Sequence, residues 1–193
     1  MTSVASPSGP DATLGNFTVP RLTTERLLLR EPQTRDFTAY AEHMCDDEAT
    51  QYMGGALDRR GAWRAFLVGA GNWIVTGSGW WTLEERATGT IVGTVGAFFR
   101  DTNIDRGRDA DLELGWVVFR PFAKRGFARE AARAALAWSL ARHDPARVIA
   151  HISKENVASI AVSRALGMTH VGEVDFYGEP SQLYAIERQA AAD

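Results

Sequence analysis

The stretch that decides the fold runs from residue 112 to residue 131 and reads LELGWVVFRPFAKRGFAREA. Its first part, Leu112–Val118, is apolar and has the length of a buried strand. Its last part begins at Phe127, is rich in alanine, and repeats apolar residues at helical spacing as far as Arg142. A basic turn that contains Gly126 lies between them. The stretch therefore predicts a strand, a turn and a helix.

A strand-turn-helix unit of this composition is suited to bind a phosphate. A helix start carries unpaired N–H groups and a partial positive charge. Gly126 lets the backbone approach an anion closely, and Lys124 and Arg125 add positive charge beside it. The spacings of nucleoside-triphosphate and dinucleotide loops are absent. A plain capping turn with solvated basic side chains is the alternative.

The flanking segments predict further strands and helices around this unit. Strands are expected at residues 26–30, 79–83, 91–99, 148–152, 169–174 and 183–188. Helices are expected at residues 34–43 with Thr34 as N-cap, at 59–68, and at 156–166 with Asn156 as N-cap and Gly167 after the end. A strand, a crossover helix and a strand imply parallel pairing in the middle. The predicted fold class is α+β, with a mixed sheet of about seven strands flanked by about four helices.

Length and charge narrow the class of protein. The chain has 193 residues, which suits one domain, and a formal net charge of −3. No basic cluster points to nucleic acid or to an anionic membrane, and no apolar run has the length of a bilayer span. The single cysteine, Cys45, excludes an intrachain disulfide and fits a reducing compartment, so we expect a cytoplasmic protein.

Four short motifs, in order, carry a family resemblance. They are LTTERLLLR at residues 22–30, ELGW at 113–116, RGFAREA at 125–131, and NVAS at 156–159 followed by LGM at 166–168. With them the chain, from about Pro20 to Arg188, resembles the GNAT superfamily of N-acetyltransferases. It is most similar to the branch that includes the ribosomal-protein N-terminal acetylases. We expect a flexible tail at residues 1–19, an N-acetyltransferase domain at 20–189 and a short tail at 190–193.

The resemblance implies a fold that is splayed at its cofactor cleft, and an acetyl-CoA co-substrate with no metal. The CoA pyrophosphate would lie on backbone N–H groups of Arg125, Gly126, Phe127 and Ala128, with Lys124 beside them. The pantetheine arm would pair with the backbone of Trp116, Val117 and Val118, in a cleft where this strand splays from residues 147–152. Asn156 would hold the arm and Ser159 would lie near the thiol.

Two positions depart from the family's pattern. Ala123 stands where many relatives have Gln or Arg in the phosphate motif, and Ser163 stands where many have a Tyr that protonates the thiolate. A backbone cradle does not need the first side chain, but the second departure leaves the general acid open. A non-catalytic acyl-CoA-binding or sensing domain is therefore one alternative, and a structural module is another.

Direct acetyl transfer to an amine needs a base, an oxyanion donor and a proton source. Glu113 is the candidate base because it lies on the strand that flanks the cleft, although a solvent-facing Glu is the alternative. Asp111 is the reserve. The N–H of Val117 or Val118 is the expected oxyanion donor, and Ser159 the thiol partner and possible acid. His151 is expected to be a satisfied strand histidine, although it lies near the cleft.

The acceptor is left open between protein N-termini, polyamines, amino acids and aminoglycosides. The segment between the first two helices, residues 46–60 with Tyr52 and Met53, corresponds to the variable substrate-side region of relatives and would select the acceptor. Tyr177 and Glu179 are expected to overhang the other side. The expected partners are a CoA thioester and an amine, with no nucleic acid or membrane, and the chain is expected to be a monomer or a homodimer.

Overall fold

The structure is a computed structural model that describes residues 18–100, 110–176 and 178–187. The predicted tails lie outside these ranges, apart from residues 18 and 19, and so does Tyr177. The elements in chain order are β1 (Leu22–Thr23), β2 (Leu27–Arg30), the 3-10 turn η1 (Thr34–Asp36), α1 (Phe37–Met44), α2 (Asp47–Thr50), α3 (Arg59–Thr76), β3 (Gly79–Glu85), β4 (Ile91–Phe99), β5 (Asp111–Val118), the 3-10 turn η3 (Arg120–Phe122), α4 (Phe127–His143), β6 (Arg147–Ile152), α5 (Val157–Ala165), β7 (Thr169–Phe176) and β8 (Glu179–Glu187).

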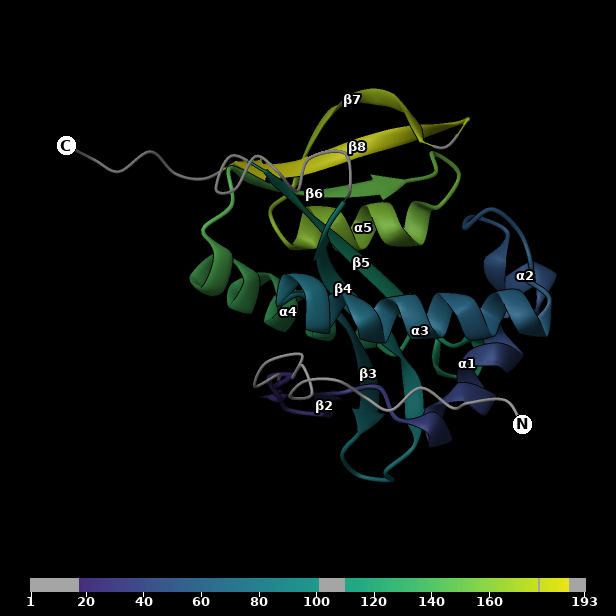
Figure 1. Cartoon of the computed structure of the whole chain (residues 1–193). Coiled ribbons are helices and arrows are strands. Elements are labelled where there is room, and N and C mark those ends of the chain that lie inside the picture. The colour runs from purple at the N-terminus through teal and green to yellow at the C-terminus, as the bar shows by residue number, and fades with distance from the viewer. Residues whose placement is uncertain (1–17, 101–109, 177, 188–193) are drawn as a thin grey trace, which may run out of the picture.

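The described strands form one mixed sheet in the order β1-β2-β3-β4-β5-β6-β8-β7. Every neighbouring pair is antiparallel except β5 and β6, which run parallel and are connected by the α4 crossover (Figure 1). This confirms the predicted fold class and the parallel middle. The described residues hold one more strand and one more α-helix than predicted, because the two-residue β1 and the four-residue α2 are too short to give a periodic pattern.

Two helix predictions were wrong at their ends. Gln33, and not Thr34, holds the N-cap position of η1, where its N–H donates to the Asp36 carboxylate over 2.8 Å. Helix α3 continues past Val68 to Thr76 although it contains Gly69 and Gly71. Glycine lowers helix propensity, but a Cβ at Gly69 would lie 3.3 Å from the Trp80 side chain. Tertiary packing against Trp80 therefore explains why Gly69 lies inside α3, although glycine's low helix propensity predicts that the helix ends there.

The main core lies between α4 and the sheet. Phe127, Ala131 and Ala135 of α4 are almost fully buried against Leu112 and Leu114 of β5. The small alanines let the helix approach the strands closely, and burial of the apolar side chains stabilises the pair by roughly 25 cal/mol per Å² removed from water. Within the described ranges, no helix has both the length and the apolar character that a bilayer crossing needs.

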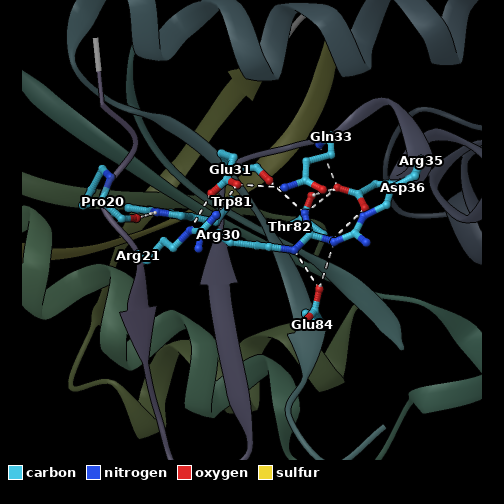
Figure 2. Close-up of polar contacts among 10 residues, drawn as sticks. All are labelled: Pro20, Arg21, Arg30, Glu31, Gln33, Arg35, Asp36, Trp81, Thr82 and Glu84. Carbon is cyan, nitrogen blue, oxygen red and sulfur yellow. Dashed lines mark hydrogen bonds and ion pairs between the residues drawn. The ribbon is translucent and has the colours of Figure 1, made fainter. Parts of the chain in front are cut away.

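A buried ion pair joins η1 to strand β2 of the sheet. The guanidinium of Arg30, on β2, donates to both Asp36 carboxylate oxygens over 2.8 Å and to Glu84 of β3 over 2.8 Å (Figure 2). Asp36 also accepts from the Thr82 hydroxyl over 3.0 Å. Both partners of the pair are at most 2% exposed. Because every charged atom has a partner, the network fixes η1 and α1 against β2 and β3.

Candidate active site

A cleft opens where β5 and β6 separate. The two strands pair only from Asp111 to Glu113 of β5 and from Arg147 to Ile149 of β6, although they continue to Val118 and Ile152. In Figure 1, β6 runs above α5 while β5 runs diagonally away from it and below α5. Beyond Glu113, β5 keeps its pairing with β4 on one edge. Its other edge therefore presents backbone donors and acceptors to the opening, as an unpaired strand edge does. The expected splay is confirmed.

The turn before α4 has the backbone form of an anion cradle. Lys124 and Gly126 have positive φ angles of 61° and 82°. Residues of this conformation turn successive N–H groups toward one concave side. Gly126 is the N-cap of the 17-residue α4, and no side chain in the described part of the chain caps it. The first N–H groups of α4 are therefore left for solvent or a ligand.

Residues from the start of the chain hold this turn from behind. Arg26 donates to the carbonyl of Arg125 over 2.8 Å, and its guanidinium lies 4.8 Å from the centre of the Phe127 ring. Glu130 accepts from the Thr24 hydroxyl over 2.6 Å and from the Arg26 N–H over 2.8 Å. Burial acts to raise the pKa of Glu130, but these hydrogen bonds outweigh it and the pKa lies below its ordinary value. The sequence motifs contained Arg26 and Glu130, but gave no sign that they meet.

The two basic side chains of the turn differ in their surroundings. Lys124 is exposed. The guanidinium of Arg125 forms an ion pair with Glu85 at 2.5 Å and lies 4.7 Å from the Phe127 ring centre. Ala128, the next residue in the first turn of α4, is half-buried. Arg125 thus has a carboxylate partner within the protein, while its backbone remains part of the turn.

The start of α5 faces the cleft from the β6 side. Asn156 is its N-cap, and the Asn156 side-chain oxygen accepts the Ser159 N–H over 3.1 Å, as predicted for the cap. The Ser159 hydroxyl in turn accepts the Trp116 indole N–H over 3.3 Å. This hydrogen bond bridges β5 and α5 across the splay. By contrast, Ser163 is fully buried and donates to the Ile160 carbonyl over 2.9 Å, so its hydroxyl is directed into the helix.

Glu113 lines the cleft and does not face solvent. The residue is 8% exposed, and Arg100 forms an ion pair with its side chain, donating to both carboxylate oxygens, one of them over 2.8 Å. Asp111, the reserve candidate on the same strand, is held by Arg147 through hydrogen bonds of 2.7 and 2.8 Å. Arg100 was missed by sequence reasoning, because no local pattern relates residue 100 to residue 113.

His151 meets Glu113 at the same end of the cleft. Its Nε2 lies 4.0 Å from a Glu113 oxygen, and its ring stacks on Phe176 with 4.2 Å between centres. Its Nδ1 is buried and has no hydrogen-bond partner among the described residues. Burial, as the largest cause, lowers the pKa of His151, and Arg100 adds to this effect. The prediction of a satisfied strand histidine was therefore wrong for this nitrogen, since the Phe176 ring of β7 stacks on the imidazole.

The cleft has a volume of about 610 Å3, within the usual range of ligand sites. Its lining includes Trp116, Asn156 and Ser159, and also Glu113 and His151. Tyr52, Met53 and Glu179, from the two segments expected to flank the acceptor, line it as well.

Trp80 is the second residue that sequence reasoning missed at this site. Its ring lies across Gly96 of β4 and Gly115 of β5, where an added Cβ would stand 2.5 and 2.7 Å from ring atoms. It also stacks on Phe98 at 5.5 Å. The two glycines form a floor for the indole, because any side chain there would expel it. Their spacing along the sequence carried no sign of this, since the three residues are neighbours only by strand register.

The chain is similar to known acetyltransferases in sequence and fold. A family model described as "Acetyltransferase (GNAT) domain" matches residues 26–169. The uncharacterised N-acetyltransferase YnaD of Bacillus subtilis is 26% identical over 159 residues, which are 78% of this chain and 84% of that protein. A crystal structure of an acetyltransferase from Agrobacterium tumefaciens is 27% identical, with a TM-score of 0.77, over 93% of this chain and 99% of that one.

Two more distant crystal structures share the fold. The ribosomal-protein-S5-alanine acetyltransferase of Vibrio fischeri has 15% identity and a TM-score of 0.71, over 91% of this chain and all of that one. The spermidine N-acetyltransferase of Vibrio cholerae, in complex with CoA and spermine, has 14% identity and a TM-score of 0.69, over 86% and 97%. At these identities the likeness is one of fold.

Proposed function

The chain belongs to the GNAT acetyltransferase domain family, and from this premise we propose that it moves an acetyl group from acetyl-CoA directly to a primary amine in the cleft between β5 and β6. The observation that carries the proposal is the combination of two features that follow one another along the chain. β5 has an unpaired edge along the cleft, and the uncapped start of α4 comes after β5 and the short turn η3. The first suits an amide-containing arm and the second suits a pyrophosphate.

The residues proposed to bind acetyl-CoA follow from these two features. Backbone N–H groups of residues 125–128 would receive the pyrophosphate, with the exposed Lys124 adding charge. Trp116, Val117 and Val118 would pair with the pantetheine arm, and Asn156 and Ser159 would meet it from α5. The solved spermidine N-acetyltransferase of the same fold holds CoA, which supports this cofactor. Arg26 and Glu130 would act indirectly, by holding the turn in place.

Acetyl transfer needs a base, an oxyanion donor and a proton source close to the thioester carbonyl. The amine arrives protonated and must lose a proton before it can attack the thioester carbonyl. We propose Glu113 as the group that accepts it, because its carboxylate lines the cleft and is nearly buried. The N–H of Val117 or Val118 would receive the developing oxyanion. Ser159, within reach of the Trp116 indole, would lie beside the departing thiolate and supply its proton.

His151 is a second candidate for the base, favoured by a specific observation. Arg100 donates to both oxygens of Glu113, whereas Nδ1 of His151 has no partner among the described residues. The lowered pKa of His151 keeps the ring neutral at pH 7, which is the form that accepts a proton. In this reading Glu113 would position the imidazole and stabilise its charge.

The activity is tested with two measurements on the whole chain. Acetyl-CoA should raise the melting temperature, because it binds the native state. At one hundred times its Kd it should add about 2.7 kcal/mol to the free energy of unfolding. Release of free CoA thiol should then require a primary amine. A protein that neither responds to millimolar acetyl-CoA nor releases thiol with any amine would contradict the proposal. The exposed single cysteine, Cys45, fits the reducing cytoplasm that we propose as its location.

A further inference from the structure

A second, smaller cavity lies beside the acetyl-transfer cleft. It is lined by Tyr40 and Met44 of α1, Phe66 of α3, Trp80 of β3, Val117 of β5, and Met53. Met53, Trp80 and Val117 also line the cleft, so the two spaces meet at these residues. Val117 belongs to the backbone stretch proposed to receive the oxyanion. The cavity therefore begins next to the reacting carbonyl.

The walls of this cavity are apolar and uncharged. Among the described residues that line it there is no Asp, Glu, Lys, Arg or His. Its polar side chains are few, and the Thr82 hydroxyl already donates to Asp36. An ammonium group placed here would lose its water without gaining a carboxylate, which is costly. A polyamine or an aminoglycoside, each with further cationic groups, is thus poorly matched to this cavity.

The volume of the cavity indicates the size of the group that it can bind. Its volume is about 140 Å3. An engineered apolar cavity of about 150 Å3 in another protein stays dry and binds benzene. Trp80 forms a rigid wall because its ring is held between the glycine floor and α3. The methionines Met44 and Met53 are adaptable in shape.

We infer that this cavity is the acceptor's side-chain pocket, and that the acceptor is a primary amine bearing an uncharged aromatic or branched aliphatic group of about benzene size. The inference rests on the proposed function, since it takes the amine to attack beside Val117. When the amine nitrogen lies at that point, a group two or three bonds from the nitrogen enters the cavity. A free arylalkylamine and a chain that starts with a large apolar residue share this chemistry.

The test uses binding and turnover together on the full chain. Phenethylamine should raise the melting temperature of the CoA-loaded protein with saturation, and ethanolamine and spermidine should not. In thiol-release assays kcat/KM for phenethylamine should exceed that for ethanolamine by roughly ten- to a hundredfold, the scale on which an apolar pocket discriminates. Peptides starting with Phe or with Ser form a second arm, which shows whether the aromatic amine is free or part of a chain.

A filling variant supplies the control. Ala65 lines the cavity from α3, and Ala65→Leu should lower kcat/KM for phenethylamine at least about tenfold while leaving that for methylamine unchanged. Val68→Leu places the same leucine side chain at an exposed position of the same helix and should change neither. If Ala65→Leu does not fold, as judged by its acetyl-CoA thermal shift, Met44→Gln provides the same comparison through polarity.

The outcomes separate the two proposals. No saturable binding of phenethylamine, or equal or better turnover of spermidine or ethanolamine, overturns the inference while leaving the acetyltransferase proposal standing. No acetyl-CoA shift and no thiol release with any amine overturns the proposed function. Binding of phenethylamine that Ala65→Leu abolishes supports the inference whether or not turnover is fast.

Discussion

At the scale of single residues, the open question is which group takes the proton from the amine. Glu113 and His151 lie 4.0 Å apart at the same end of the cleft. Glu113 is held by Arg100, whereas burial lowers the pKa of His151 and favours its neutral form. Both are placed to accept a proton, and variants of each residue measured against pH separate the two.

We expect Glu113→Gln to lower kcat about 10²–10⁴-fold, the usual contribution of a positioned general base, with little change in acetyl-CoA affinity. The loss should shrink as pH rises, because more amine then arrives deprotonated. His151→Gln, measured over the same range of pH, should lower kcat less than about tenfold. The measurement is thiol release against pH, with thermal shift reporting acetyl-CoA binding.

Asp111→Asn is the matched control, since it neutralises a carboxylate on the same strand that Arg147 holds. A larger loss in His151→Gln, together with disappearance of the acid limb of the profile below about pH 6.5, would reverse the assignment in favour of His151. Equal loss at every pH in Glu113→Gln would indicate a binding role for this residue.

At the scale of elements, the start of α4 is the part on which cofactor binding depends. Gly126 has a left-handed backbone, which costs other residues conformational energy, and among the described residues a Cβ there would meet only Arg26, at 3.4 Å. Gly126→Ala should therefore lower the free energy of unfolding by about 1 kcal/mol and modestly weaken CoA binding. Gly126→Asp adds a negative charge among the N–H groups and should abolish the acetyl-CoA thermal shift. A full shift in Gly126→Asp would remove the turn from the proposed site.

The start of α5 combines a structural and a proposed binding role in Asn156. Asn156→Ala removes the cap on the Ser159 N–H and should lower the free energy of unfolding by about 1 kcal/mol. It should also raise the Kd for CoA, because the side chain lines the cleft. Asn156→Asp, which retains a capping oxygen, is the control for stability. Unchanged CoA affinity in Asn156→Ala would leave Asn156 as a cap alone.

At the scale of the whole molecule, the buried Arg30–Asp36 pair ties the N-terminal elements to the sheet and sets part of the acid stability. Asp36→Asn leaves a buried guanidinium without its main partner and should cost about 3–5 kcal/mol at pH 7. Burial acts to raise the pKa of Asp36, but hydrogen bonds from Arg30 and from the Gln33 N–H lower it below the ordinary value. The native state thus holds fewer protons here than the unfolded state.

This stabilisation is fully present above the ordinary Asp pKa of about 3.9, and it is lost as pH falls through the lower native value. The free energy of unfolding in urea should therefore fall less steeply in acid for Asp36→Asn than for the natural chain. Parallel curves for the two proteins would show that Asp36 does not contribute to the acid dependence.

Local sequence determined much of this protein. The start of α4 at Phe127, the Asn156 cap and the bounds of β4 follow from residues within a few positions of each other, because propensity, capping and alternation act locally. The four motifs together also indicated the family and its splayed sheet. These features need no knowledge of which strands become neighbours.

Tertiary structure alone decided the contacts that shape the site. Arg100 on Glu113, Arg26 on Glu130, and Trp80 over Gly96 and Gly115 join residues 13 to 104 positions apart, or residues on separate strands. Sheet order and helix packing bring them together, and a shift of register by one residue would turn the strand side chains Glu113 and Trp80 to the opposite face. The same reason hid the apolar pocket, since α1, α3 and three strands must assemble before its walls exist.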